Sequence, residues 1–204
     1  MFSPRKEKSS VQYPLTRMEQ IRMVRTNLES RIGKGKAAIL VTSPGGAEQQ
    51  GLITAKLGAA LAEQGKNVLL IDANLREPSL HDYFSTRNHN GFTECMERKE
   101  FIIDHVHATF INRVALLTAG NGSALLQHDR IKTIVDAAKS MFDCILIDAP
   151  GFLRDADAGT LISSCDGAVL VVKTNKTKRK ELSAVKQHFL RTEQTIYGVI
   201  CQTG

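Results

Sequence analysis

The sequence predicts an α/β fold with a doubly wound, mainly parallel sheet and helices on both of its faces. Short runs rich in β-branched residues or leucine recur along the chain, at residues 37–43, 67–72, 113–118, 143–149, 167–173 and 195–201. Most of these runs are separated by stretches of helical periodicity, at residues 50–64, 124–141, 157–164 and 178–191. The runs are apolar on both faces, as "NVLLID" and "GAVLVV" illustrate, which is typical of parallel strands buried between two layers of helices.

The elements follow a polar N-terminal segment. We expect residues 1–15 to form a flexible basic arm and residues 16–204 to form a single domain. Helical spacing begins at residue 16 and continues to about residue 32. The apolar face of this helix consists of Met18, Ile21, Val24 (or Arg25) and Leu28. Gly33–Gly35 ends the helix, since glycine is the usual terminator, and the alternation of strands and helices then starts.

The composition is that of a globular domain. The 204 residues, of which 42% are apolar and 24% charged, are enough for one α/β domain with a sizeable core. No apolar run reaches the roughly 18 residues of a membrane span, and we expect no secretory signal peptide. The net charge of +6 comes mainly from residues 4–8 and 173–180. We interpret these runs as solvated surface, with anionic membrane, nucleic acid or an acidic partner as the alternatives.

The four cysteines lie far apart, without the spacing of a metal site. Three of them, Cys144, Cys165 and Cys201, lie in or beside apolar strand-like runs, whereas Cys95 does not. We therefore expect buried free thiols in a reducing cytoplasm.

Polar and loop residues gather where the predicted strands end. The segment Thr42–Gly51 follows the first strand, and Asp72 and Asp148 each end a later one. Ligands of doubly wound sheets bind at this edge, and a glycine-containing loop before a helix presents backbone N–H groups to phosphate oxygens. The sequence therefore predicts a phosphate site here. An aspartate at a strand end can also merely cap the next turn, and this structural alternative applies to both aspartates.

Five ordered segments carry a resemblance to a known family. They are "EQIRMVR" (19–25), "VTSPGGAEQQGLITAKLGAALAEQG" (41–65), "VLLIDANLREPSLHDYF" (68–84), "FDCILIDAPG" (142–151) with Asp157-Ala158 behind it, and the strands "DGAVLVVK" and "IYGVI". They match the family's E-x-x-R-x-x-R helix, Walker A loop and helix, second Walker motif, Walker B strand and last two strands. Over residues 19–202 the chain thus resembles the bacterial tyrosine kinases (BY-kinases) of capsule and exopolysaccharide synthesis, relatives of the MinD/ParA P-loop ATPases.

The resemblance implies a P-loop NTPase type of fold, with ATP and magnesium as cofactors. It implies catalytic roles for Asp72 and Asp148, which would also hold the magnesium ion or its waters. The nucleotide-binding positions that it implies are Ser43, Gly45, Gly46, Gln49, Gln50, Gly51, Leu52, Asn74 and Arg76. The same resemblance implies that Glu19, Arg22 and Arg25 serve oligomerisation, because in the family this helix motif bridges neighbouring subunits into a ring.

The Walker A loop departs from the family's G-E-G-K-S-T. Aligned without gaps, that motif falls on Ala47–Leu52, so Gln50 stands in place of the lysine and Gly51 in place of the magnesium-binding hydroxyl. A shift by one residue gives a Gly46–Gly51 frame, but it places a leucine and an isoleucine at those two positions. It would also rotate the next helix by about 100° away from its core face. We therefore prefer the ungapped register and interpret the loop as a degenerate Walker A motif.

Two further departures accompany the first. The family's D-x-D becomes Asp72-Ala73-Asn74. The only tyrosines of the sequence are Tyr13, Tyr83 and Tyr197, whereas the family usually ends in a tyrosine cluster that is autophosphorylated. Losing one preorganised electrostatic contact typically costs about a hundred- to a thousandfold in rate, so the combined losses predict impaired phosphoryl transfer. Nothing in the sequence indicates that the basic runs elsewhere reach the loop.

The sequence therefore predicts a pseudokinase-like homologue that acts as a regulatory or scaffold subunit in capsular or exopolysaccharide synthesis. The resemblance implies two kinds of partner, a membrane-embedded polysaccharide co-polymerase (the chain-length regulator) and further copies of this chain or of an active paralogue. It also implies a cytoplasmic location, peripheral to the inner face of the cell membrane through that partner. One alternative is an active tyrosine kinase or ATPase with an atypical loop. A weaker one is a ParA/MinD-like positioning ATPase that binds DNA or membrane, because that group also needs the loop lysine; we expect no nucleic acid.

Overall fold

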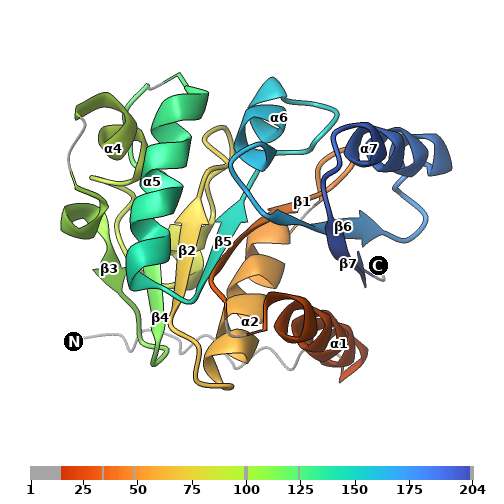
Figure 1. The fold of residues 1–204 in the computed structure, drawn as a ribbon, viewed down its shortest axis with the longest axis horizontal. Helices are drawn as coiled ribbons and strands as arrows, with labels where there is room; N and C mark the ends of the chain where they lie inside the picture. The colour runs from red at the N-terminus through yellow and green to blue at the C-terminus, as the bar shows by residue number, and fades with distance from the viewer. Residues whose placement is uncertain (1–14, 34, 48, 99–100, 124, 203–204) are drawn as a thin grey trace, which may run out of the picture.

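The sheet has seven strands in the order β3-β4-β2-β5-β1-β6-β7 (Figure 1). The computed structural model describes residues 15–33, 35–47, 49–98, 101–123 and 125–202. The strands are β1 (Ala37–Thr42), β2 (Val68–Asp72), β3 (His107–Ala108), β4 (Val114–Leu117), β5 (Cys144–Asp148), β6 (Gly167–Lys173) and β7 (Ile196–Gln202). Every pairing is parallel except that of β3 with β4, so the predicted mainly parallel sheet is confirmed. Strand β3 was not predicted, because two residues are too few to show a period.

Five of the helices were predicted from periodicity. The helical elements are α1 (Leu15–Ile32), α2 (Gln50–Ala62), α3 (Leu80–Tyr83), α4 (Phe92–Arg98), η1 (Ile102–His105), α5 (His128–Met141), α6 (Ala156–Ile162) and α7 (Arg179–Arg191). The short α3, α4 and η1 were missed, since one or two turns do not show an apolar stripe. Residues 1–14 of the predicted arm lie outside the described residues, and α1 begins at Leu15.

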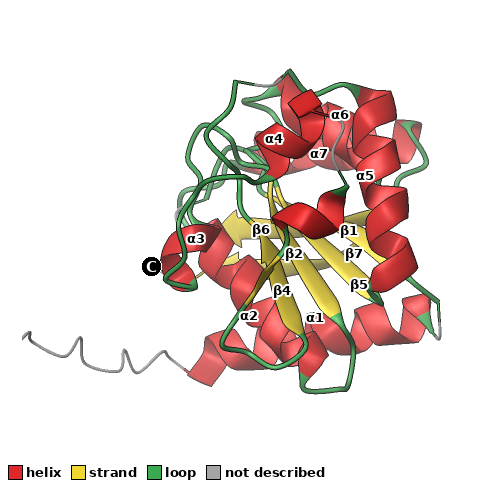
Figure 2. Cartoon of the chain, turned by 90° about the vertical axis from the view of Figure 1, so that its left-hand side faces the viewer, coloured by secondary structure: helices red, strands yellow, loops and turns green. Residues whose placement is uncertain are grey.

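Two hydrophobic cores lie on opposite faces of the sheet, as doubly wound folds require. Side chains alternate along a strand, so Ala38 and Leu40 of β1 face the core under α4–α7. Ile39 and Val41 face the core that α1, α2 and α3 cover. Figure 2 shows the two layers of helices above and below the sheet. Both faces are dry, which explains why the strands are apolar without alternation.

The buried faces of α1 and α2 fix their registers. In α1 the buried residues are Ile21, Val24 and Leu28, so Val24 rather than Arg25 faces the core; the side chain of Met18 lies outside the described part. The buried residues of α2 include Ile53, Leu57, Ala60 and Leu61. This is the core face that the ungapped alignment of the loop requires.

The prediction that the thiols are buried is wrong for one of them. Cys95 and Cys144 are buried and Cys165 is half-buried, but Cys201 is exposed. Strand β7 is an edge strand on which Gly198 and Ile200 face α1, so the alternating residues Val199 and Cys201 point to the other face and stay exposed. Burial raises the pKa of Cys144 to about 12, which keeps it an inert thiol. No helix in the described ranges is long and apolar enough to cross a membrane.

Candidate phosphate-binding site

The loop between β1 and α2 rests on the segment that follows β5. The backbone N–H of Phe152 donates to the Ser43 carbonyl (2.8 Å) and that of Leu153 to the Pro44 carbonyl (3.0 Å). A Cβ built on Gly151 would overlap the backbone nitrogen of Gly46, so only glycine allows the two loops to approach this closely. The loop then enters α2 through Gln49, which adopts a left-handed conformation with φ of 60°. The described part of the loop, which excludes residue 48, is thus packed against the segment after β5.

Gln50, which the ungapped alignment assigns to the position of the family's lysine, points into the sheet. Its side chain is buried, with 6% of the residue exposed. The amide nitrogen Nε2 donates to Ala149 O (2.7 Å), Asp148 Oδ1 (3.0 Å) and Val41 O (3.2 Å). An amide has two N–H bonds, so one of them is shared between acceptors. The Gln50 amide is therefore a neutral donor whose hydrogen bonds are all made to the ends of β1 and β5 and to the residue after β5.

Asp148 lies under Gln50 at the end of the central strand β5. Its Oδ1 also accepts a hydrogen bond from the Thr54 hydroxyl (2.7 Å), one helical turn after Gln50, whereas its buried Oδ2 has no hydrogen-bond partner among the described residues. Asp72 is its in-register neighbour on β2. Burial, reinforced by the charge of Asp72, raises the pKa of Asp148 to about 7, although the bonds from Gln50 and Thr54 lower it. Burial therefore keeps this carboxyl group protonated to a higher pH than an ordinary aspartate.

Asp72 is engaged by the turn that follows it. Its Oδ2 accepts the backbone N–H groups of Ser79 and Leu80 (both 2.9 Å), and its Oδ1 accepts that of Asn74 (3.3 Å). Burial raises the pKa of Asp72, while these three bonds oppose the rise. These contacts are those of the capping alternative: the carboxylate satisfies the start of α3. We call Gln50, Thr54, Asp72 and Asp148 together the site floor.

The residues present do not fit a magnesium ion. Magnesium prefers octahedral oxygen ligands, but Gly51, which the ungapped alignment assigns to the family's hydroxyl ligand, has no side-chain oxygen. The Ser79 hydroxyl packs so closely on Gly51 that a Cβ there would overlap it. The second acid of the motif is the amide Asn74. The described residues contain no group of three or more His, Cys, Asp or Glu side chains that could hold a metal.

A cavity of about 650 Å³ opens above the site floor, at the carboxyl ends of the strands. It brings together part of the predicted nucleotide site, namely Gly45, Gly46, Gln50, Asn74 and Arg76. The other predicted positions do not line it. Ser43 is buried beneath the loop, and Gly51 packs on α3. Gln49 and Leu52 instead line a small pocket between α1, α2 and β7.

Basic side chains surround this cavity, and most of them were not among the predicted site residues. We call them the basic rim: Arg76, Arg154, Lys173, Lys176 and Lys178. Arg76 Nε forms an ion pair with Asp155 Oδ2 (2.6 Å), and Arg154 Nη1 lies 3.3 Å from where a Cβ of Gly46 would be. The rule that places Asp148 at the sheet edge also places Lys173, because each ends a parallel strand. Only the sheet order, however, puts β6 beside β1 and its basic run beside the loop.

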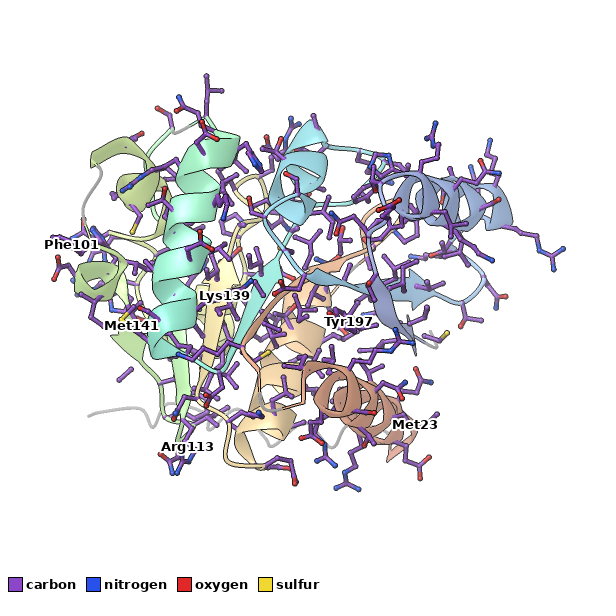
Figure 3. All side chains as sticks on the ribbon, viewed as in Figure 1. Met23, Phe101, Arg113, Lys139, Met141 and Tyr197 are labelled. Carbon is purple, nitrogen blue, oxygen red and sulfur yellow. The ribbon has the colours of Figure 1, made fainter. Side chains whose placement is uncertain are left out.

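The predicted oligomerisation residues lie on α1, away from the cavity. Glu19 and Arg22 are exposed, whereas Arg25 is half-buried with its Nε 3.9 Å from Glu29 Oε1. Met23, between them, is 67% exposed and points away from the sheet (Figure 3).

Two tyrosines lie inside folded elements. Tyr197, labelled in Figure 3, is part of β7 and donates its hydroxyl to the Asp166 carbonyl (3.2 Å). Tyr83 is in α3, and Tyr13 lies outside the described residues.

The sheet order, the loop at the end of β1 and the aspartates at the ends of β2 and β5 define a P-loop type of domain. The family model described as "ATPase MipZ" matches residues 37–175, more than half of the chain. The chain is thereby placed among the P-loop ATPases of the MinD/ParA superfamily.

Comparison with individual proteins shows which family of this superfamily the chain resembles. The chain is 32% identical over 187 residues to the tyrosine-protein kinase YwqD of Bacillus subtilis, covering 89% of this chain and 79% of the relative. Two solved structures share the fold at 22% identity. The kinase domain of the Escherichia coli tyrosine kinase ETK has a TM-score of 0.84, covering 96% of this chain and 84% of that one. The chimerical protein CapA2B2 has a TM-score of 0.81, covering 95% and 86%. The chain belongs to the bacterial tyrosine-kinase (BY-kinase) family.

Proposed function

We propose that this chain is a catalytically impaired member of the family that serves as a regulatory or scaffold subunit in capsular or exopolysaccharide synthesis. The observation that carries the proposal is the buried amide of Gln50, hydrogen-bonded to Asp148, Ala149 and Val41 at the position of the lysine. Phosphoryl transfer depends on positive charge that meets the negative charge of the transferred group, and an amide supplies none.

Other features of the site floor support the same proposal. Gly51 has no hydroxyl, a Cβ there would overlap the Ser79 hydroxyl in its present position, and burial raises the pKa of Asp148. Each missing contact of this kind costs about a hundred- to a thousandfold in rate. Even with non-additive effects, the degenerate Walker A loop leaves little transfer activity.

The subunit role rests on surfaces outside the site. The exposed Glu19 and Arg22 on α1 are available for contact with further copies of this chain or with an active paralogue. The family resemblance adds a membrane-embedded co-polymerase as adaptor, and the similarity to the chimerical protein CapA2B2 is consistent with a CapA-type partner. Through such a partner the chain would lie in the cytoplasm, at the inner face of the cell membrane.

A transfer assay tests the catalytic part of the proposal. Purified chain is incubated with radiolabelled ATP, magnesium and a tyrosine peptide, and we expect no labelling of the chain or the peptide. YwqD assayed in parallel serves as the positive control. Turnover of about one per second or more, abolished by Asp148→Asn, is ordinary kinase behaviour and would refute the proposal.

Light scattering tests the subunit part. We expect the wild-type chain to self-associate and Arg22→Ala to reduce the assembled fraction. Arg31→Ala removes an exposed arginine from the same helix and is the matched control. A monomeric wild type that also fails to join an active paralogue would remove the scaffold role.

A further inference from the structure

The basic rim and the phosphate loop face one cavity although they come from distant parts of the sequence. Arg76 follows β2, Arg154 follows β5, and the three lysines belong to the end of β6 and the loop before α7. Gly45 and Gly46 of the loop line the same cavity. Among the described lining residues, five basic side chains stand against three acidic ones, which are Glu77, Asp155 and Glu181. The cavity therefore carries a net positive charge.

We infer that this cavity is an oligophosphate site that works without magnesium, in which Arg154, Lys176 and Lys178 replace the positive charge missing at position 50. The inference deepens the proposed function, on which it rests, by naming the class of ligand that the impaired subunit would hold. An oligophosphate here is a chain of linked phosphate groups, either free or as part of a nucleotide.

The geometry suits phosphate at the cavity wall rather than at the site floor. Arg154 lies directly against Gly46, where its planar guanidinium and the loop backbone can meet the same phosphate group. Lysines act on phosphate as point charges, so Lys176 and Lys178 need no fixed geometry to attract it. The volume of about 650 Å³ lies within the range of about 300–1,000 Å³ that small-molecule sites occupy.

Because the site has no fitting ligands for magnesium, the ion should weaken the binding of phosphates. In the family the ion neutralises part of the phosphate charge, but here the hydroxyl of position 51 and the second carboxylate are missing. Both oxygens of Asp72 are occupied by backbone N–H groups. Binding then depends on attraction between the basic rim and the full charge of the phosphates. Magnesium, by neutralising two of those charges, should weaken it.

Glu181 opposes the ligand. Its Oε2 lies 3.4 Å from where a Cβ of Gly45 would be and accepts the backbone N–H of Lys178 (3.1 Å). A carboxylate so close to the loop repels an incoming phosphate. Removing its charge should strengthen binding, which gives a variant of opposite sign to those of the basic rim.

Calorimetric titration of the full chain with tripolyphosphate, ATP and ADP tests the inference, each in EDTA and in excess magnesium. We expect tripolyphosphate and ATP to bind in EDTA and magnesium to weaken both about threefold or more. Arg154→Ala and Lys178→Ala should each weaken binding in EDTA about fivefold, and Glu181→Gln should tighten it about twofold. Lys186→Ala removes an exposed lysine of α7 that does not line the cavity, and it should change nothing.

The outcomes separate the possible ligands and the two proposals. Tighter binding of ATP than of tripolyphosphate would identify a nucleotide as the source of the phosphates, and equal binding a free phosphate chain. Binding that requires magnesium, that ATP shows but tripolyphosphate does not, or that ignores Arg154→Ala and Lys178→Ala would overturn the inference. No binding at all would also overturn it while leaving the impaired subunit intact. Turnover in the transfer assay would instead remove the proposed function.

Discussion

The site floor and the basic rim differ in how they hold charge, although Gln50 of the site floor lines the same cavity as the basic rim. In the site floor, Gln50 and Thr54 each donate a hydrogen bond to Asp148. The carboxylate of Asp72 accepts the backbone N–H of Ser79, in the turn before α3. The basic rim holds its charges at the solvent edge, where Arg76 for example is 77% exposed. Burying a charge is costly unless it is paired, so a neutral interior is easy to keep and charge at the edge costs little. Catalysis of phosphoryl transfer needs positive charge in the site floor, whereas binding of an anion needs only the positive charges of the basic rim.

The largest expected effect comes from placing a charge in the site floor. Gln50→Glu puts a carboxylate beside Asp148 and the Ala149 carbonyl, where the three atoms that Gln50 Nε2 now contacts are all acceptors. We expect the free energy of unfolding at pH 8 to fall by about 3 kcal/mol, since an unpaired charge is then buried. Urea denaturation measures it. The adjacent Gln49 is exposed, so Gln49→Glu should change stability by less than about 0.5 kcal/mol, and equal effects of the two would contradict the buried placement of Gln50.

The second effect is a pH dependence of the site floor. The pKa of Asp148 in the folded chain, about 7, lies above its ordinary value of 3.8, so between these values the folded state holds a proton that the unfolded state has lost. This contribution to stability is complete below about pH 3.8 and is lost as the pH rises through 7. Relative to Asp148→Asn, wild type should therefore lose about 2 kcal/mol between pH 5 and pH 8, measured by urea denaturation. A constant difference would show that Asp148 is already ionised in the fold.

A third variant introduces the residue types of the family's motifs into the loop and its surroundings. The variant carries Gln49→Gly, Gln50→Lys, Gly51→Ser and Asn74→Asp, together with Ser79→Ala to make room for the new side chain at position 51. We expect magnesium-ATP to bind about tenfold more tightly, or roughly 1.4 kcal/mol, and magnesium now to favour binding. The same variant with Gln50 retained is the control, and it should show no gain. If neither gains affinity, the loop backbone itself has left the path that cradles phosphate.

The smallest effect is on stability at the basic rim. Arg154→Ala removes an exposed side chain, and we expect the free energy of unfolding to change by less than about 0.5 kcal/mol. Thermal unfolding of the two proteins in one buffer measures it. A loss above about 2 kcal/mol would mean that the guanidinium holds the loop in place, and that its effect on phosphate binding is indirect.

Sequence reasoning predicted the sheet because most of its strands are apolar on both faces and alternate with helical stretches, and it placed Asp72 and Asp148 at one edge because each ends such a strand. It could not predict the direction of the Gln50 side chain, since the first residue of a helix is not fixed by the apolar period. The packing of Ser79 on Gly51 joins residues far apart in the sequence, and it depends on how α3 meets α2. The placement of Lys176 and Lys178 required the order of strands, which adjacency along the chain does not give. Cys201 was misjudged because an apolar run does not show that β7 lies at the edge.

The close approach of Gly151 to Gly46 makes one position unusually intolerant of change. Gly151 is half-exposed, and exposed positions ordinarily accept many residues. Here the conflict arises with the Cβ, which every residue other than glycine carries, and it is with backbone atoms that cannot rotate away. The disturbance should therefore not grow with the size of the new side chain: alanine should disturb the loop nearly as much as leucine. The two loops can thus lie against each other only because residue 151 has no Cβ.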